Sequence, residues 1–320
     1  MKFSIIGPVH PYRGGIAQHT TALNQALSQN HQTQVITFRR QFPGWLYPGA
    51  TDRDPSQRPP IPSAEYILDP LYPWTWYRTL QSIRSFNPDL TIIQWWTTFW
   101  AIPDRVICRS LQKNKLRVAY LIHNVLPHET RPGDKMLASL GLGGSDQFIV
   151  QNPHEKDILL NLYPDADIQV CLLPGFPQLS DQMLDQSAAR KQLNLDQNAD
   201  IILFFGIVRE YKGLRTLLQS MTQLKRSGFT PTLIIAGEFW EQKQEYIRLI
   251  NDAGLQNQVI IEDRYLPDAE AHLYFLSADV LVAPYTAGTQ SAVTALAGSY
   301  GIPVIASQQI ADGISPQGSS

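Results

Sequence analysis

Short apolar runs rich in β-branched residues alternate along the chain with longer stretches in which apolar residues recur at helical spacing. Buried strands of a parallel sheet have such runs, and the helices that connect them are amphipathic. In the first half, strands are expected at Lys2–Gly7, Gln34–Phe38, Asp89–Trp96, Leu116–Asn124, Gln147–Gln151 and Gln169–Leu173. Helices are expected at Ile16–Ser28, Tyr77–Phe86, Arg105–Gln112 and Pro153–Leu162. The pattern predicts a parallel sheet with helices on both faces.

The second half repeats the same rhythm. Strands are expected at Asp200–Phe205, Thr232–Ala236, Val259–Ile261, Asp279–Ala283 and Pro303–Ala306. Helices are expected at Leu214–Ser227, Glu241–Ala253, Asp268–Ser277 and Gln290–Tyr300. Two prolines and a glycine in Leu173–Pro177 interrupt regular structure between the halves. We therefore expect an α/β protein of two doubly wound domains, residues 1–174 and 175–320.

Two segments depart from this rhythm. Residues 39–74 are rich in proline and in aromatic residues, so we expect a long loop there rather than a regular layer. Loops of this length are usually functional or mobile. After the last predicted strand only the polar tail Ser307–Ser320 follows, and the second domain is expected to be cut short.

Composition narrows the class of protein. The 320 residues, 43% of them hydrophobic and 17% charged, are enough for two globular domains and exclude a disordered chain. With 26 basic and 28 acidic residues, the net charge of −2 offers no basic field for non-specific nucleic-acid binding. Cys108 and Cys171 are too far apart in sequence for a metal-binding pair, which favours a reducing compartment. No signal peptide or membrane-spanning stretch is visible, so we expect a cytoplasmic location.

Glycines follow the first predicted strand. Gly14 and Gly15 allow close approach of a ligand to the backbone and open the next helix, whose free N–H groups favour an anion or a hydroxyl. The spacing is not that of the dinucleotide-binding fingerprint, which argues against a dehydrogenase. An ordinary turn remains the alternative. His19, one turn into the helix, would by itself be a packed core histidine.

Polar residues cluster after the strand predicted at Leu116–Asn124. Their spacing matches no strong zinc pattern, and no metal site is expected. A cluster that binds sugar hydroxyls fits better, and histidines satisfied by the neighbouring loop backbone are the alternative. The cluster consists of His123, Asn124, His128 and Glu129.

Two cations follow the first strand of the second domain, after Gly206. Arg209 and Lys212 lie at the start of a helix, where positive charge is unfavourable unless an anion lies between them. A diphosphate bound by these cations and by backbone N–H groups fits, and two solvated surface charges are the alternative. A later turn offers further phosphate donors or ordinary helix caps. Its residues are Gly288, Thr289, Gln290 and Ser291.

An aromatic run follows the strand that ends near Gln94. Aromatic faces stack on sugar rings and also suit the edge of a membrane, and a packed core between domains is the equally supported alternative. The run comprises Trp95, Trp96, Phe99 and Trp100.

Taken together, these segments resemble family-4 retaining glycosyltransferases of the GT-B fold over nearly the whole chain. The most specific match is Gly206-x-x-Arg209-x-x-Lys212-Gly213, which is similar to that family's diphosphate-binding motif. The loop with Gly14, Gly15 and His19 resembles its acceptor-side loop, and His123 matches a histidine at the sugar end of its cleft. HNVLPHE and QWW resemble a bacterial branch associated with surface polysaccharide biosynthesis.

The resemblance implies two Rossmann-like domains facing across a cleft and a metal-independent, retaining hexosyl-type glycosyltransferase. It would move sugar from a nucleotide-diphosphate sugar to a glycan or lipid-linked acceptor, with no cofactor. His123, Arg209 and Lys212 would be catalytic. Donor binding would involve Gly206, Arg209, Lys212, Gly288, Thr289, Gln290 and Ser291. The acceptor or sugar loop would comprise Gly14, Gly15, His19, Asn124, His128 and Glu129.

Two departures from the family keep a second function open. The family often has two glutamates near the last donor helix, where this chain has Gly288 and Leu296. The family also continues well beyond the strand at Pro303–Ala306. The alternative is therefore a catalytically inactive, truncated remnant that binds a nucleotide or glycan. Peripheral contact of residues 39–74 with the inner face of the plasma membrane is left open, although no basic patch is visible in the sequence.

Overall fold

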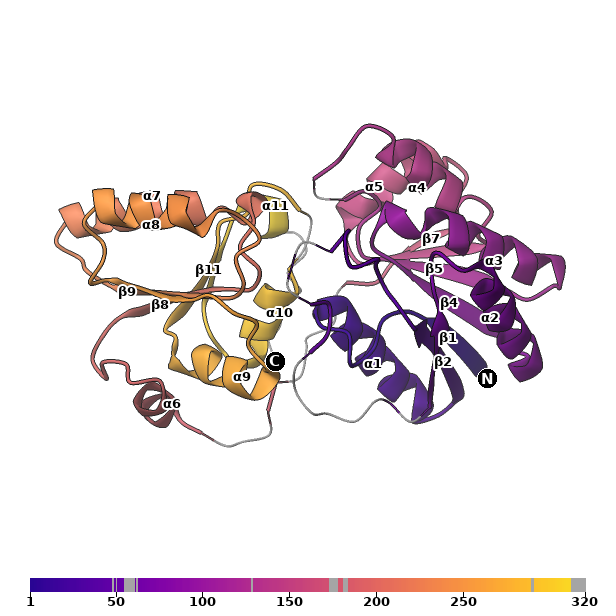
Figure 1. Ribbon diagram of the computed structural model, residues 1–320, viewed down its shortest axis with the longest axis horizontal. Coiled ribbons are helices and arrows are strands. Elements are labelled where there is room, and N and C mark those ends of the chain that lie inside the picture. The colour runs from indigo at the N-terminus through magenta and orange to yellow at the C-terminus, as the bar shows by residue number, and fades with distance from the viewer. Residues whose placement is uncertain are drawn as a thin grey trace. The chain divides into compact units, whose positions relative to one another are not determined.

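The chain forms two compact units, Met1–Leu172 and Leu173–Ser320. The computed structural model describes residues 1–47, 49, 51–54, 61, 63–127, 129–172, 178–180, 184–288 and 291–311. The first unit is coloured indigo to magenta in Figure 1, and the second is mostly orange to yellow. The boundary predicted between residues 174 and 175 lies outside the described residues.

Unit 1 is built on a seven-stranded parallel sheet of order β3-β2-β1-β4-β5-β6-β7. Its strands are apolar because both faces of the sheet are covered; every residue of β5, for example, is buried. The strands are β1 (Lys2–Ile6), β2 (Gln32–Phe38), β3 (Ala64–Leu68), β4 (Leu90–Trp95), β5 (Val118–Ile122), β6 (Gln147–Val150) and β7 (Ile168–Val170).

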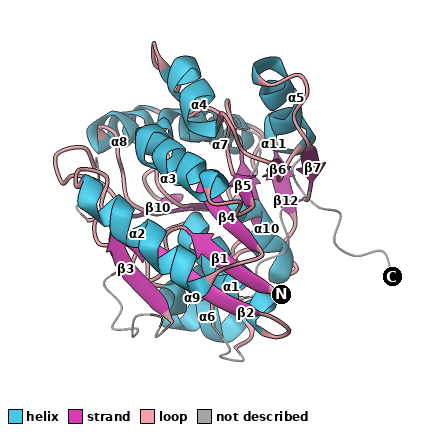
Figure 2. Cartoon of the chain, turned by 90° about the vertical axis from the view of Figure 1, so that its right-hand side faces the viewer, coloured by secondary structure: helices cyan, strands magenta, loops and turns pink. Residues whose placement is uncertain are grey.

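The helices of unit 1 connect these strands. Three of them, α2, α3 and α4, lie side by side on the face turned to the viewer in Figure 2. Helix α5 begins as its sequence predicts, because the Asn152 side chain accepts a hydrogen bond from His154 N at 2.7 Å and Pro153 takes the first helical position. The helices are α1 (Gly15–Ser28), α2 (Pro73–Phe86), α3 (Ala101–Lys113), α4 (Asp134–Leu142) and α5 (Pro153–Leu162).

Unit 2 is built on a five-stranded parallel sheet of order β10-β9-β8-β11-β12. Two apolar clusters pack against this sheet, one around Phe275 and the other around Met221. The strands are β8 (Ile201–Phe205), β9 (Thr232–Ala236), β10 (Val259–Glu262), β11 (Val280–Ala283) and β12 (Val304–Ala306). The helices are α6 (Gln186–Gln192), α7 (Leu214–Arg226), α8 (Lys243–Asp252), α9 (Asp268–Ser277), α10 (Ala292–Ser299) and α11 (Gln308–Ala311).

The order of strands reverses once in each sheet, between β1 and β4 in unit 1 and between β8 and β11 in unit 2. Ligands of doubly wound sheets bind at such switch points, outside the carboxyl ends of the strands. The prediction of two doubly wound α/β domains is confirmed. The predicted site loops follow β1, β5, β8 and β11, so they lie at the carboxyl edges of the two sheets.

Three expectations were wrong. The stretch 39–74 contains β3, which pairs in parallel with β2, because Tyr66, Ile67 and Leu68 form a short run of residues that favour strands despite the prolines around it. Helices α4 and α6 were not predicted, since α4 contains Gly141 and α6 has only seven residues. The supposedly polar tail begins with α11, whose Ile310 is buried against Ala283 and Tyr285.

Candidate functional site

The loop after β8 packs directly on the loop after β11. Gly213, with φ +73°, leads into α7, and a Cβ at this position would lie 1.9 Å from the carbonyl oxygen of Pro284. Thr286 N donates a hydrogen bond to the carbonyl oxygen of Tyr211 at 2.7 Å. Only glycine at position 213 allows the backbone to come this close to Pro284. The two loops are therefore held together at the switch point of the unit 2 sheet.

Lys212 is a buried cation in this loop, with 8% of its surface exposed. Its Nζ lies 2.9 Å from where a Cβ on Gly206 would be and 5.5 Å from the ring centroid of Tyr285. Among the described residues, no carboxylate forms an ion pair with Lys212. Burial lowers the pKa of this ammonium; nearby Tyr211 raises it, and the Arg209 charge lowers it again. A buried ammonium without a counter-ion is costly, and an anionic ligand would remove that cost.

Arg209 supplies a second positive charge. Its guanidinium lies 5.9 Å from the ring centroid of Tyr211 and 5.7 Å from that of Trp240, which follows β9. Stacking on aromatic faces is a favoured environment for a guanidinium. Lys212 N donates a hydrogen bond to the carbonyl oxygen of Arg209 at 2.9 Å, so the two cationic residues share one turn at the carboxyl edge of the sheet.

The loop after β11 contributes hydroxyl groups beside Lys212. Ser291 is buried directly before α10, and its Oγ lies 3.2 Å from the hydroxyl oxygen of Tyr285. Burial raises the pKa of Tyr285 to about 12, so its hydroxyl stays protonated. Gly288 is described and adopts φ +106°. The predicted donor residues Thr289 and Gln290 lie outside the described residues.

At the carboxyl edge of unit 1, two histidines distant in sequence lie against each other. His19 of α1 and His123, directly after β5, are both buried, and their rings meet edge to face with centroids 5.0 Å apart. Burial lowers the pKa of His19 to about 4. Burial and then the neighbouring His19 lower the pKa of His123 well below its usual value, although a hydrogen bond with Gln151 opposes the shift. Both imidazoles are therefore neutral at pH 7.

Two glutamine side chains bind these imidazoles. Gln94, in β4, accepts a hydrogen bond at Oε1 from Nε2 of His123 over 2.6 Å. Gln151, directly after β6, donates from Nε2 to Nε2 of His19 over 2.7 Å. With these assignments the remaining proton of His19 is on Nδ1, which is buried with no partner among the described residues.

Gly7 makes room for this cluster. A Cβ on Gly7 would lie 2.6 Å from Cγ of Gln94, so the backbone after β1 must lack a side chain there. Sequence reasoning missed Gln94 and Gln151, which it treated as ends of strands. The available signal was a polar residue at the end of an apolar strand, because such a position faces the ligand edge of the sheet.

The other predicted residues of unit 1 are less closely associated with this pair. Gly14, with φ +107°, directly precedes α1. Asn124 is partly buried, Glu129 is exposed, and His128 lies outside the described residues. Trp95 and Trp100 are 1% exposed and belong to the core of unit 1 itself, so for these two residues neither stacking on a ligand nor a packed core between the domains is what the structure shows.

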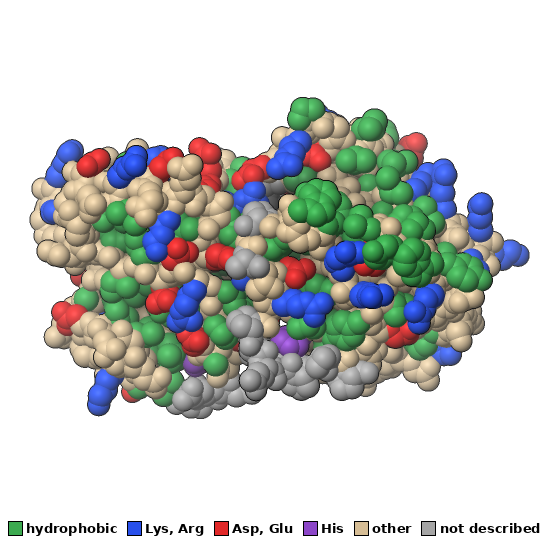
Figure 3. All heavy atoms as spheres, viewed as in Figure 1, with side chains coloured by type: hydrophobic (Ala, Val, Ile, Leu, Met, Phe, Trp, Pro, Cys, Tyr) green, Lys and Arg blue, Asp and Glu red, His purple; other side chains and the backbone are tan. Residues whose placement is uncertain are grey.

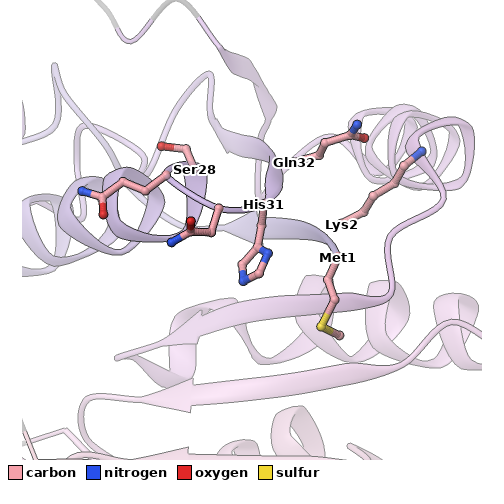
Figure 4. Close-up of a pocket in the computed structure, with 7 residues that line it drawn as sticks. Met1, Lys2, Ser28, His31 and Gln32 are labelled. Carbon is pink, nitrogen blue, oxygen red and sulfur yellow. The ribbon is translucent and has the colours of Figure 1, made fainter.

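A separate pocket of about 580 Å³ lies at the amino ends of β1 and β2, at the edge opposite the predicted loops (Figure 4). It contains none of the predicted site residues. The described residues also contain no group of three or more His, Cys, Asp or Glu side chains that could hold a metal ion. The pocket at the amino ends of β1 and β2 is lined by Met1, Lys2, Ser28, Gln29, Asn30, His31 and Gln32.

Each of the two units matches a known protein family. Residues 13–174 match the family described as Glycosyltransferase Family 4, and residues 199–317 match the one described as Glycosyl transferases group 1. A D-inositol 3-phosphate glycosyltransferase of Frankia alni is 27% identical in an alignment of 192 residues that covers 54% of this chain and 46% of the relative. A D-inositol 3-phosphate glycosyltransferase of Catenulispora acidiphila is 28% identical in an alignment of 174 residues that covers 52% of this chain and 41% of the relative. The chain thus aligns with less than half the length of these curated relatives.

Solved structures share the fold at low sequence identity. Sucrose-phosphate synthase from Thermosynechococcus elongatus has a TM-score of 0.69 and 17% identity, covering 97% of this chain and 82% of its own. Anabaena Alr3699/HepE in complex with UDP-glucose has a TM-score of 0.68 and 18% identity, covering 97% and 81%. The architecture is therefore that of GT-B proteins. No described helix is long and apolar enough to cross a membrane.

Proposed function

Because the chain belongs to glycosyltransferase family 4, we propose that it moves a hexosyl group from a nucleotide-diphosphate sugar to a glycan or lipid-linked acceptor. The transfer retains the anomeric configuration and needs no metal ion. Solved relatives carry UDP-glucose in one case and ADP with acarbose in another, which supports a nucleotide-sugar donor without fixing the base.

One observation carries the proposal: Lys212 is a buried ammonium that forms no ion pair among the described residues and lies at the switch point of the unit 2 sheet. The donor diphosphate would supply the counter-ion that the described residues do not provide. Arg209 provides the second positive charge, and Gly206 leaves the space above β8 that Nζ occupies. Charge-assisted hydrogen bonds of this kind are about twice as strong as neutral ones.

The chemistry follows from where charge develops. When the bond from the anomeric carbon to the diphosphate oxygen breaks, negative charge grows on the diphosphate, while the acceptor oxygen bonds to the sugar and its hydroxyl proton passes to the departing diphosphate. Cations accelerate this step if they bind the departing diphosphate more strongly than they bind the diphosphate of the intact donor. Two fixed positive charges perform the task that a metal ion performs elsewhere.

Unit 1 would contact uncharged groups. The neutral His123 can bind a sugar hydroxyl, and Gln94 fixes which of its nitrogens carries the proton. Gln151 does the same for His19, whose Nδ1–H is a donor for a hydroxyl or carbonyl oxygen. Gln94 and Gln151 are thus positioning residues in this proposal, and Gly14 and Gly15 leave room for the acceptor.

The test is turnover of UDP-glucose, GDP-mannose and ADP-glucose by the purified full chain, with EDTA present. Lys212→Met keeps the length of the side chain and removes its charge, and turnover should fall by roughly 10²–10³. Arg209→Ala should reduce turnover in the same way. Arg215→Gln is the matched control, because Arg215 is exposed on α7 and paired with Glu245 at 3.2 Å.

Each other outcome has a definite meaning. Near-wild-type turnover by Lys212→Met would remove Lys212 from catalysis. Nucleotide binding without turnover of any donor would contradict the transferase and favour the inactive reading. Turnover that EDTA abolishes would contradict the metal-independent mechanism.

A further inference from the structure

Exposed apolar side chains are concentrated on one part of unit 1. Of the 16 large hydrophobic side chains exposed among the described residues, ten follow the strands β2, β3, β4 and β5. Scattered exposed apolar residues are ordinary, but a concentration of them marks a contact surface. The ten are Trp45, Leu46, Leu71, Tyr72, Trp74, Tyr77, Ile102, Val106, Met136 and Leu140.

Helices α2, α3 and α4 present most of this surface, and we call their exposed side chains the α2–α4 face. On α3 the exposed stripe is Ile102, Val106, Arg109 and Lys113, at the spacing of one helix face. Apolar and basic side chains gather in Figure 3 on the part of the view where Figure 1 draws these helices. The face is therefore apolar and basic at once.

The charges on this face have one sign. The acidic residues of the three helices are Asp104 and Asp134, and both are buried. The chain as a whole has a net charge of −2, so this surface differs from the average of the molecule. The basic residues of the three helices are Arg78, Arg84, Arg105, Arg109, Lys113 and Lys135.

The apolar part lies next to the ligand edge. Each of the three helices follows a strand, so each begins at the carboxyl edge of the sheet. On α2, Trp74 and Tyr77 are near that beginning and Arg84 is near the end. In the exposed stripe of α3, Ile102 and Val106 likewise precede Arg109 and Lys113. Helix α4 differs, because Lys135 precedes Met136 and Leu140. An occupant of this face would therefore be apolar beside the edge that carries His19 and His123.

We propose that the α2–α4 face docks on the surface of an anionic lipid bilayer. Tryptophan and tyrosine at the rim suit the membrane interface, and lysine and arginine attract anionic headgroups. A second copy of this chain is disfavoured as the occupant, because two such faces would bring like charges together. The proposal concerns docking and does not depend on sugar transfer.

The test is flotation of the full chain with vesicles, in the absence of any sugar donor. Vesicles of phosphatidylcholine with phosphatidylglycerol should bind the chain, and vesicles of phosphatidylcholine alone should bind it far less. Added salt should weaken binding, because it screens the charges. No flotation with anionic vesicles would overturn the proposal.

Two double variants separate the apolar and basic contributions. Arg109→Gln with Lys113→Gln should weaken binding by about 25-fold, at about fivefold for each charge. Trp74→Ser with Tyr77→Ser should weaken it on the order of tenfold. Two variants at exposed positions of unit 2 are the matched controls, and each should bind like wild type. One control is the double variant Arg226→Gln with Arg248→Gln, and the other is Phe229→Ser.

The alternatives give different results. Equal binding by wild type and both double variants would show that lipid contacts another surface and would overturn the proposal. A dimer in solution that these variants dissociate, without flotation, would assign the face to a second copy instead. Transfer activity without flotation contradicts the docking only, whereas flotation without turnover contradicts the proposed function only.

Discussion

The two units place different electrostatic environments at equivalent edges. Both sheets reverse their strand order at the first strand of the unit, and both carry buried polar side chains there. In unit 1 these are two neutral imidazoles bound by amides, whereas in unit 2 the buried ammonium Lys212 lies close to Arg209. In the proposed function, the same topology therefore serves an uncharged partner in one unit and an anion in the other.

Burial lowers the pKa of cationic side chains at both edges, but the effect on their charge at pH 7 differs. It lowers the pKa of His19 and that of Lys212, because it disfavours the charged form of either group. An imidazole titrates ordinarily near 6.5, so this shift removes its charge at pH 7. An ammonium titrates ordinarily near 10.4 and has much further to fall. For this reason lysine and arginine suit the proposed diphosphate site better than histidine does.

The largest expected effect concerns backbone packing at the unit 2 edge. Gly213→Ala should destabilise unit 2 by ~3 kcal/mol or more, because the new Cβ would meet the carbonyl oxygen of Pro284. Gly133→Ala in unit 1 is the matched comparison, since Gly133 also has a positive φ before a helix but has open space around it. It should cost only about 1 kcal/mol. Chemical denaturation followed by circular dichroism measures both, and equal losses would contradict the tight packing.

The second effect concerns acid stability of unit 1. As pH falls below about 6.5 the unfolded chain protonates His19 while the folded chain resists until about pH 4. The free energy of unfolding is therefore highest above pH 6.5 and should fall by about 2 kcal/mol between pH 7 and 5, with His123 acting in the same direction.

Intrinsic fluorescence measures this effect in unit 1, where six of the seven tryptophans lie. Urea unfolding at pH 7 and at pH 5 gives the change in the free energy of unfolding between these pH values, for wild type and for His19→Gln. The variant should have the shallower dependence on pH, because one of the two titrating groups is gone. An unchanged dependence would mean that His19 is not buried in its neutral form.

The smallest effect concerns the amides that position the histidines. Gln94→Leu removes the acceptor of His123 and should cost about 1 kcal/mol of stability. If His123 contacts the sugar, kcat should also fall about tenfold with little change in KM. Gln112→Leu is the control, because its amide binds the exposed Asp146 at 3.0 Å. A loss confined to stability would make Gln94 a purely structural residue.

The sequence predicted what depends on local spacing. Arg209 and Lys212 share one short loop, so their proximity could be read directly, and most strands were visible as apolar runs. The pairing of His19 with His123 joins segments far apart in sequence and required the fold. The α2–α4 face was missed for the same reason, because its basic residues are dispersed over three helices. Strand β3 was hidden by the prolines around it.

The central claim is that Lys212, with Arg209, binds a diphosphate. The most direct measurement is calorimetric titration of wild type and Lys212→Met with UDP, GDP and ADP and with the corresponding nucleosides. For the nucleotide that binds, the account predicts that the affinity gained from the diphosphate falls by roughly 10- to 100-fold in the variant, while nucleoside affinity is unchanged. An equal gain from the diphosphate in both proteins would contradict it.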